Sequence, residues 1–413
     1  MSHSHGHGTP ESGPPRPELA RVLFGVVAAI AVVTAVAMVV LWPSSDDVPH
    51  ATGPYSGEGV TTVDATVTSV TPWDCGADGG FGIDDQPTAA GDCRTVTATV
   101  DEGGEKASFE LDPTRHRAVE LEEGDDIRLM RFQPTDADEP SFEFRDFQRG
   151  FPLLALALAF AVLVAVVGRL RGALAIVGIG VTVFALMKFV LPAILAGESP
   201  LLVAIVGSTG IMIAVLYLAH GVSIRTTSAL FGTLFGIAFT ALLGVVGTHW
   251  AQLTGVSSED DLYLIGTVPD LRFQGIVAAS MVIAGLGVLN DVTVTQASAV
   301  WEMRALQPIV GRWELFRSAM RIGRDHIASS VYTLVFAYAG SAMTVMLLIT
   351  AYQQGLLEVL TAEQIANEVV RTLVGAIGLV LAVPVTTAFA VWLAPPAVEG
   401  PLSDDSQKVV PKA

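Results

Sequence analysis

Two groups of polar residues interrupt long apolar runs in the second half of the chain. Asn290 and Asp291 end one apolar run, and Arg324, Asp325 and His326 begin the next. A carboxylate within a membrane costs about 3 kcal/mol, so it should face a cavity or a partner. Oxygen and imidazole groups bind cations or carry protons. These residue types predict an ion- or solute-binding site formed by Asn290, Asp291, Thr293, Thr295, Gln296, Arg324, Asp325 and His326.

The same residues also allow a structural interpretation. An ion pair between Asp291 and Arg324 would hold the intervening loop in place without binding a solute. A second pair, Glu368 and Arg371, has the i, i+3 spacing that places both side chains on one helix face. Facing the helix bundle, this pair would act as a gate, whereas at the membrane interface it would only fix the depth of its helix. Both alternatives stay open at this point.

Long helices must position these residues. The chain has 413 residues, 51% of them hydrophobic, and the apolar residues are grouped in uncharged runs. Runs of roughly 20 residues cross a hydrocarbon core of about 30 Å as helices, and we expect about eight of them. They cover residues 22–41, 151–168, 173–196, 201–218, 228–246, 276–289, 327–349 and 368–393. The fold class is therefore a polytopic α-helical membrane protein.

Three of these runs carry further structural signals. The run 276–289 is too short to cross alone, so its helix either continues through Asn290 and Asp291 or breaks there. Gly232 and Gly236 have the GxxxG spacing that lets membrane helices approach closely. Pro384 interrupts the last run, and we expect a kink there.

Between residues 48 and 148 the pattern changes to an alternation of apolar and polar residues. The apolar positions are 63, 65 and 67, then 96, 98 and 100, then 107, 109 and 111, then 127 and 129. This period predicts antiparallel strands. About five strands suit a small extracytoplasmic all-β domain, with an OB-like barrel preferred and a sandwich as the alternative. Outside the cell, Cys75 and Cys93 would form a disulfide worth about 3 kcal/mol.

The distribution of charge predicts the orientation. Arg16 and Arg21 precede the first run, and five arginines lie in residues 304–324. Because basic residues favour the cytoplasmic side, both termini should be cytoplasmic in a bacterial plasma membrane, with the β domain outside. The expected parts are a disordered cytoplasmic tail (1–21), a first transmembrane helix (22–42), the β domain (48–148), a seven-helix membrane domain (151–394) and a cytoplasmic tail (395–413).

Several stretches of the chain resemble the YibE/F family of bacterial multi-pass membrane proteins. They read GVLNDVTVTQASAVWE at 287–302, GRDHIASSVYTLVFAYAG at 323–340 and EVVRTLVGAIGL at 368–379. Together with the outer domain, the resemblance extends over residues 21–393. It implies a polytopic plasma-membrane protein with an outer domain near its amino terminus. It supplies no function.

The sequence lacks the motifs of common enzyme classes. It contains no Walker loop, no GxGxxG after a strand, no HExxH and no GxSxG, so we expect neither an enzyme nor a cofactor. A hydrolase using Asp291 and Asp325 is disfavoured because neither lies in a protease motif. The net charge of −18 is concentrated between Asp46 and Asp146, which disfavours nucleic acid as a partner.

Two functions remain for a protein whose main partner is the lipid bilayer. The preferred function is a secondary transporter or channel-like protein for a small ion or solute, because polar residues gather at the inner ends of two spans. The alternative is a membrane scaffold or sensor whose external β domain binds a ligand or a protein partner. The outer domain of about 100 residues motivates this alternative.

Overall fold

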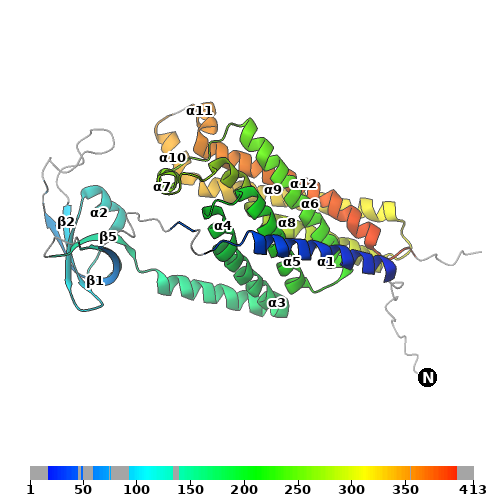
Figure 1. Cartoon of the computed structure of the whole chain (residues 1–413), viewed down its shortest axis with the longest axis horizontal. Helices are drawn as coiled ribbons and strands as arrows, with labels where there is room; N and C mark the ends of the chain where they lie inside the picture. The colour runs from blue at the N-terminus through cyan, green and yellow to red at the C-terminus, as the bar shows by residue number, and fades with distance from the viewer. Residues whose placement is uncertain are drawn as a thin grey trace, which may run out of the picture. The chain divides into compact units, whose positions relative to one another are not determined.

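The computed structural model describes residues 17–44, 48–49, 59–73, 75, 93–133, 139–353 and 355–397. They form two compact units: one reaches to Pro49 and resumes at Val164, and the other spans His50–Leu163. The first unit is helical and the second is built on a sheet (Figure 1). The amino-terminal tail before Pro17 and most of the carboxyl-terminal tail, for which we predict disorder or a polar tail, lie outside the described residues.

The β unit contains a curled antiparallel sheet of five strands in the order β3-β2-β1-β4-β5. The strands are β1 (Val60–Trp73), β2 (Cys93–Val100), β3 (Lys106–Leu111), β4 (Asp126–Phe132) and β5 (Ser141–Phe147), with helix α2 (Pro113–Val119) between β3 and β4. β1 is the longest strand, and it pairs with β4 through its first half and with β2 through its second half. This shared strand curls the sheet, and the rings of Phe109 on β3 and Phe144 on β5 stack at 6.3 Å.

The predicted alternation of the strands is confirmed. The apolar residues of β1 to β4 are buried on one side of the sheet: Ala65, Val67, Val96, Ala98, Val100, Ala107, Phe109, Leu111, Ile127 and Leu129. Polar residues occupy the positions between them. Burial of such side chains stabilises the unit by about 25 cal/mol for each Å² of apolar surface removed from water.

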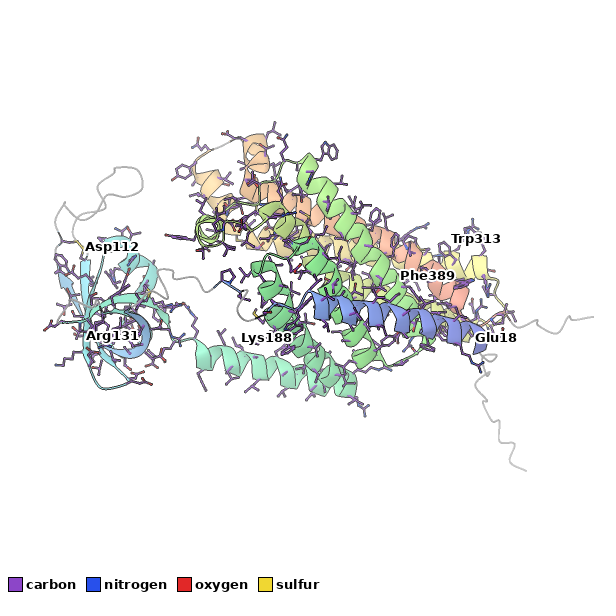
Figure 2. All side chains as sticks on the ribbon, in the orientation of Figure 1. Glu18, Asp112, Arg131, Lys188, Trp313 and Phe389 are labelled. Carbon is purple, nitrogen blue, oxygen red and sulfur yellow. A yellow bond between two sulfur atoms is a disulfide. The ribbon has the colours of Figure 1, made fainter. Side chains whose placement is uncertain are left out.

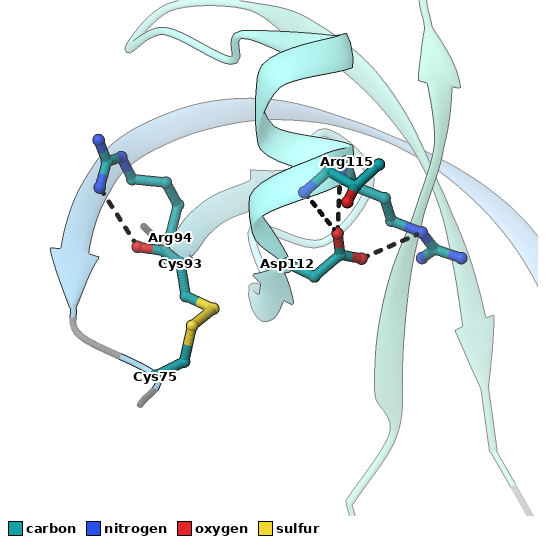
Figure 3. The surroundings of a disulfide bond; sticks show 6 residues. Cys75, Cys93, Arg94, Asp112 and Arg115 are labelled. Atoms are coloured by element: carbon teal, nitrogen blue, oxygen red, sulfur yellow. Dashed lines mark hydrogen bonds and ion pairs between the residues drawn. A yellow bond between two sulfur atoms is a disulfide. The ribbon is translucent and has the colours of Figure 1, made fainter. Parts of the chain in front are cut away.

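Two local features complete the β unit (Figure 3). Cys75 and Cys93 form a disulfide that closes a segment of 18 residues. Asp112 caps the amino terminus of α2, because its carboxylate accepts the backbone N–H groups of Thr114 and Arg115 at 2.8 and 2.9 Å. Pro113 follows the cap at the first helical position, where a missing N–H costs nothing.

The helical unit contains most of the remaining residues. Its helices are α1 (Pro17–Val40), α3 (Gly150–Ala185, which enters the unit at Val164), η1 (Leu186–Val190), α4 (Leu191–Leu195), α5 (Pro200–His220), α6 (Ile224–Trp250), α7 (Glu259–Thr267), α8 (Phe273–Leu306), α9 (Arg312–Ser341), α10 (Met343–Ala351), α11 (Leu356–Thr361) and α12 (Glu363–Leu393). Among the described residues, six helices are long and apolar enough to cross a membrane, or up to seven if the bent pair α9 and α10 counts as one span.

The centre of the helical unit is formed by α6, α8 and α12, which pack closely against one another (Figure 1). Glycines allow this approach, as the spacing of Gly232 and Gly236 predicts. A Cβ atom at Gly232 would lie 1.8 Å from the hydroxyl of Thr386, and one at Gly236 would lie 2.6 Å from a methyl of Leu289. The apolar core beside these contacts includes Ile211, Leu216, Leu230, Ile237, Val282, Leu286 and Ala382.

Two helix boundaries differ from the prediction. Residues 17–21 are helical instead of disordered, because Pro17 is compatible with a first helical turn and the apolar run propagates from it. Of the two alternatives for the short run 276–289, the structure has the first, because α8 continues through Asn290 and Asp291 without a break. α12 contains Pro384 within a continuous helix, so the proline does not end it, and the kink expected there stays a prediction. The predicted span 327–349 is divided, since α9 ends at Ser341 and α10 leaves it at 60°.

Residues near the ends of three helices lie toward the same end of the helical unit. Glu18 on α1, Trp313 on α9 and Phe389 on α12 lie toward one end, and Lys188 lies toward the other (Figure 2). The ring of Phe389 stacks on Phe231 of α6 at 5.5 Å. The basic first turns of α9 are therefore at the same end as the start of α1 and the end of α12.

Candidate functional site

A line of buried polar residues follows the contact between α6, α8 and α12. We call this line the polar seam, and it consists of Thr233 and Thr240 on α6, Asn290, Thr293 and Gln296 on α8, and Thr386 and Thr387 on α12. All of them except the half-buried Asn290 are at most 1% exposed. Buried polar groups at a helix contact need partners, because each unpaired group costs about 1–3 kcal/mol.

One end of the polar seam is well bonded. The amide nitrogen of Gln296 donates to the carbonyl of Ala319 at 3.0 Å and to the hydroxyl of Thr387 at 2.8 Å. Gly323 makes room for this amide, since a Cβ there would lie 3.0 Å from its oxygen. The hydroxyls of Thr233 and Thr293 lie 2.7 Å apart and form a hydrogen bond. These bonds join α8 to three of its neighbours, α6, α9 and α12.

Other atoms of the polar seam have no partner among the described residues. They are the side-chain oxygens of Thr240, Asn290 and Gln296. More than nine in ten buried polar atoms in proteins are hydrogen-bonded to protein or to ordered water. An oxygen left unpaired by the protein would gain a hydrogen bond from water or from a polar solute admitted to the polar seam.

An ion pair continues this polar line beyond Thr240. Arg371 on α12 contacts Glu368 at 2.9 Å and donates to the hydroxyl of Ser280 on α8 at 3.3 Å. Both charged side chains are about three-quarters buried, being 25% and 26% exposed. The second oxygen of Glu368 and the Nε of Arg371 lack partners among the described residues. Glu368 also borders an apolar groove of about 230 Å³ between α9, α10, α11 and α12.

The predicted site residues differ in their burial. Asn290, Thr293 and Gln296 face inward and belong to the polar seam, whereas the charged residues Asp291, Arg324 and Asp325 are exposed. Thr295 and His326 are half-buried. Within the described part of the chain no ion pair joins Asp291 to Arg324, and no group of three His, Cys, Asp or Glu side chains is placed to hold a metal.

Sequence reasoning missed Thr233 and Thr240 of the polar seam and also Ser280, which bonds to Arg371. Thr233, Thr240 and Ser280 are single small polar residues in apolar helices. Nothing in the sequence around them distinguishes them from ordinary packing residues. The signal that was available is the glycine spacing, because Gly232 and Gly236 mark the face of α6 on which Thr233 and Thr240 lie. The Thr386–Thr387 pair was visible beside Pro384, where we expected only a kink.

The β unit carries a separate polar hollow of about 660 Å³. It is lined by Thr62, Val63, Asp64, Asp101, Glu102, Arg128, Arg145, Asp146 and Phe147. Arg128 pairs with Asp64 at 2.9 Å. The pKa of Asp146 is lowered by a hydrogen bond from the backbone N–H of Phe147 and by the neighbouring guanidinium of Arg149. Charges of both signs therefore line the hollow.

The family of the chain follows from a comparison with known proteins. Residues 156–396, which are more than half of the chain, match the model of the family described as YibE/F-like protein. The chain belongs to the YibE/F-like family. The match confirms the resemblance seen in the three quoted stretches, all of which lie inside it. It begins at residue 156, after the last strand of the β unit, so it does not extend over the sheet as the resemblance implied.

The polar seam and the Glu368–Arg371 pair both lie within the region matched by the YibE/F-like family. Together with six helices that are apolar enough to cross a membrane, the family match makes the chain a multi-pass membrane protein. No curated protein and no solved structure matches the chain. The function must therefore be argued from the geometry of these residues.

Proposed function

We propose that the chain is a secondary transporter or channel-like protein that moves a small ion or polar solute along the polar seam. The observation that carries this proposal is the set of buried oxygens of Thr240, Asn290 and Gln296, which have no partner among the described residues. At about 1.5 Å per residue, the distance along α8 from Ser280 to Gln296 is about 24 Å. That is most of a hydrocarbon core of about 30 Å.

The proposed topology agrees with this path. Six apolar helices become eight spans if the α9–α10 pair is one span and if α3 is divided at Arg169, where the backbone leaves the helical region. We place both termini in the cytoplasm and the β unit outside a bacterial plasma membrane, because the basic segment at the start of α9 favours the inner side. The strand order, helix α2 and the nearness of β3 to β5 support an OB-like barrel.

Thr240→Val tests the proposal with little change in shape. The Thr240 hydroxyl has no partner among the described residues, so its removal should leave the thermal unfolding midpoint unchanged or raise it. We expect the flux of protons or alkali cations into proteoliposomes, followed with trapped dyes, to fall about tenfold, as for the loss of one hydrogen bond of about 1.4 kcal/mol. Asp291→Asn, which removes a charge outside the polar seam, is measured in parallel.

The controls separate transport from folding. Gln307→Leu changes an exposed polar residue at the end of α8 and should leave the flux unchanged. Equal flux through wild type and Thr240→Val would overturn the path along the polar seam. If Asp291→Asn is degraded while Thr240→Val only loses flux, Asp291 has a structural role.

The polar hollow of the β unit favours a second candidate function. A sensor or scaffold would bind its ligand at Asp64, Asp101, Arg128 and the neighbouring residues of the hollow. A chain that lacks residues 50–147 separates the two functions. Flux retained by that shortened chain would count against the sensor, and ligand binding without any flux in the whole chain would support it.

A further inference from the structure

A large pocket lies where three helices of the helical unit, α5, α6 and α8, begin or end. It has a volume of about 680 Å³, within the range of small-molecule sites. The residues around it come from the start of α5, the end of α6 and the start of α8: Ser199, Pro200, Leu201, Val245, Thr248, His249, Thr254, Val256, Leu271, Arg272, Phe273, Gln274, Gly275 and Ala278. We call it the helix-end pocket.

The ionisable residues that line the helix-end pocket are basic. Arg272 and His249 are its ionisable residues, and no carboxylate is among the residues that line it. Hydroxyl and amide groups of Ser199, Thr248 and Gln274 supply the remaining polar contacts. Thr254 is already engaged, because its hydroxyl and backbone N–H donate to Glu363 at 3.1 and 2.7 Å. The free donors and the positive charge favour an anionic occupant.

Two helix amino termini meet at this pocket. α5 begins at Pro200 and α8 at Phe273, and neither has a side chain that caps its first N–H groups or an acidic residue in its first turn. The two starts are adjacent, since a Cβ at Gly275 would lie 3.3 Å from the ring of Pro200. The amino terminus of a helix carries about half a positive charge and unpaired N–H donors, which bind anions.

Thr248 gives an independent indication that something polar binds here. Thr248 lines the pocket and is 1% exposed, and its hydroxyl has no hydrogen-bond partner among the described residues. A buried hydroxyl without a partner is destabilising unless an occupant of the pocket completes its hydrogen bond.

We propose that the helix-end pocket binds a small organic anion through a carboxylate or phosphate group. The anionic group lies at the paired starts of α5 and α8, Arg272 neutralises it, and the Thr248 hydroxyl donates to it. This proposal names the substrate class of the transport protein, and only the movement of the anion rests on the proposed function. Binding itself is independent of it.

The test measures binding to the purified full-length protein. Inorganic phosphate and succinate are titrated separately at constant ionic strength, with the dissociation constant read by calorimetry and the unfolding midpoint read in parallel. We expect saturable binding of one of them, which decides between phosphate and carboxylate. Arg272→Gln and Thr248→Val should each weaken binding about tenfold or more, as for the loss of a hydrogen bond to a charged group.

Matched controls keep the outcomes distinct. Arg321→Gln removes the same charge from an exposed position on α9 and should leave the affinity unchanged. Thr248→Val should not lower the unfolding midpoint of the anion-free protein, so weaker binding by this variant is not a folding defect. The proposal is overturned if neither anion binds, or if Arg321→Gln weakens binding as much as Arg272→Gln. Anion binding without flux would leave this site intact and reject transport.

Discussion

Gly378 on α12 lies against Thr240 on α6, in the middle of the polar seam. A Cβ atom at Gly378 would lie 2.3 Å from the Thr240 hydroxyl oxygen, closer than any non-bonded contact allows. Gly378→Ala should therefore destabilise the protein by about 1–3 kcal/mol, as overpacking of a core does. The measurement is the unfolding midpoint in detergent, followed by intrinsic fluorescence.

Two further variants identify the cause of that loss. Adding Thr240→Ala to Gly378→Ala removes the colliding hydroxyl and should restore most of the stability, which gives a coupling energy between the two positions. Gly375→Ala is the matched control on the same helix, because a Cβ there meets nothing within 4 Å. If Gly375→Ala is as destabilising as Gly378→Ala, helix contact is not the reason for the glycine.

At the scale of elements, the kink within α3 depends on the segment from Gly168 to Gly172. Arg169 has φ 53° and ψ −138°, a conformation that costs a residue with a side chain about 1–3 kcal/mol. A Cβ at Gly172 would lie 2.1 Å from the backbone carbonyl oxygen of Val164. A backbone atom cannot rotate away, so only glycine fits at position 172.

Gly172→Ala should consequently open this turn and lower the stability by roughly 3 kcal/mol, the upper end for overpacking. Gly168→Ala is its control, because that position has nothing within 4 Å of an added Cβ. Arg169→Gly should unfold at the same or a higher temperature, since glycine adopts a positive φ without strain. Thermal unfolding of the three variants, monitored by circular dichroism, checks this. Equal midpoints for Gly172→Ala and Gly168→Ala would refute the steric argument.

At the scale of the whole molecule, the state of the disulfide tests in which compartment the β unit lies. Cys75 and Cys93 close a segment of 18 residues, and such a loop stabilises a domain by about 3 kcal/mol. Disulfides persist outside the cytoplasm and are reduced within it. If the β unit is extracytoplasmic, both cysteines should resist maleimide labelling in intact cells until a reductant is added.

Cys75→Ser is the control for that labelling, because it leaves Cys93 unpaired and open to the reagent after denaturation. The expected result is a gel shift of the variant without reductant and of the wild type only after reduction. Labelling of both cysteines in the untreated wild type would place the β unit in a reducing compartment and reverse the proposed orientation. Lower thermal stability of the reduced β unit would confirm the contribution of the bridge.

The sequence by itself determined the types of structure and their order along the chain. Alternating apolar residues such as Ala65 and Val67 predict strands, and long uncharged runs predict spanning helices, because both patterns arise from burial of neighbouring positions in one segment. The YibE/F resemblance also depends on contiguous stretches. These features need no knowledge of which segments meet.

Only the tertiary structure decided which polar groups meet. Gln296 bonds to Thr387, 91 residues away in the sequence, because α8 and α12 pack against each other and both pack against α6. The rotation of α8 about its own axis turns Asn290 inward and Asp291 outward, so adjacent residues that look equivalent in sequence have different environments. The helix-end pocket likewise combines three separate helix ends. Packing fixes these rotations and approaches, and packing depends on the whole set of helices at once.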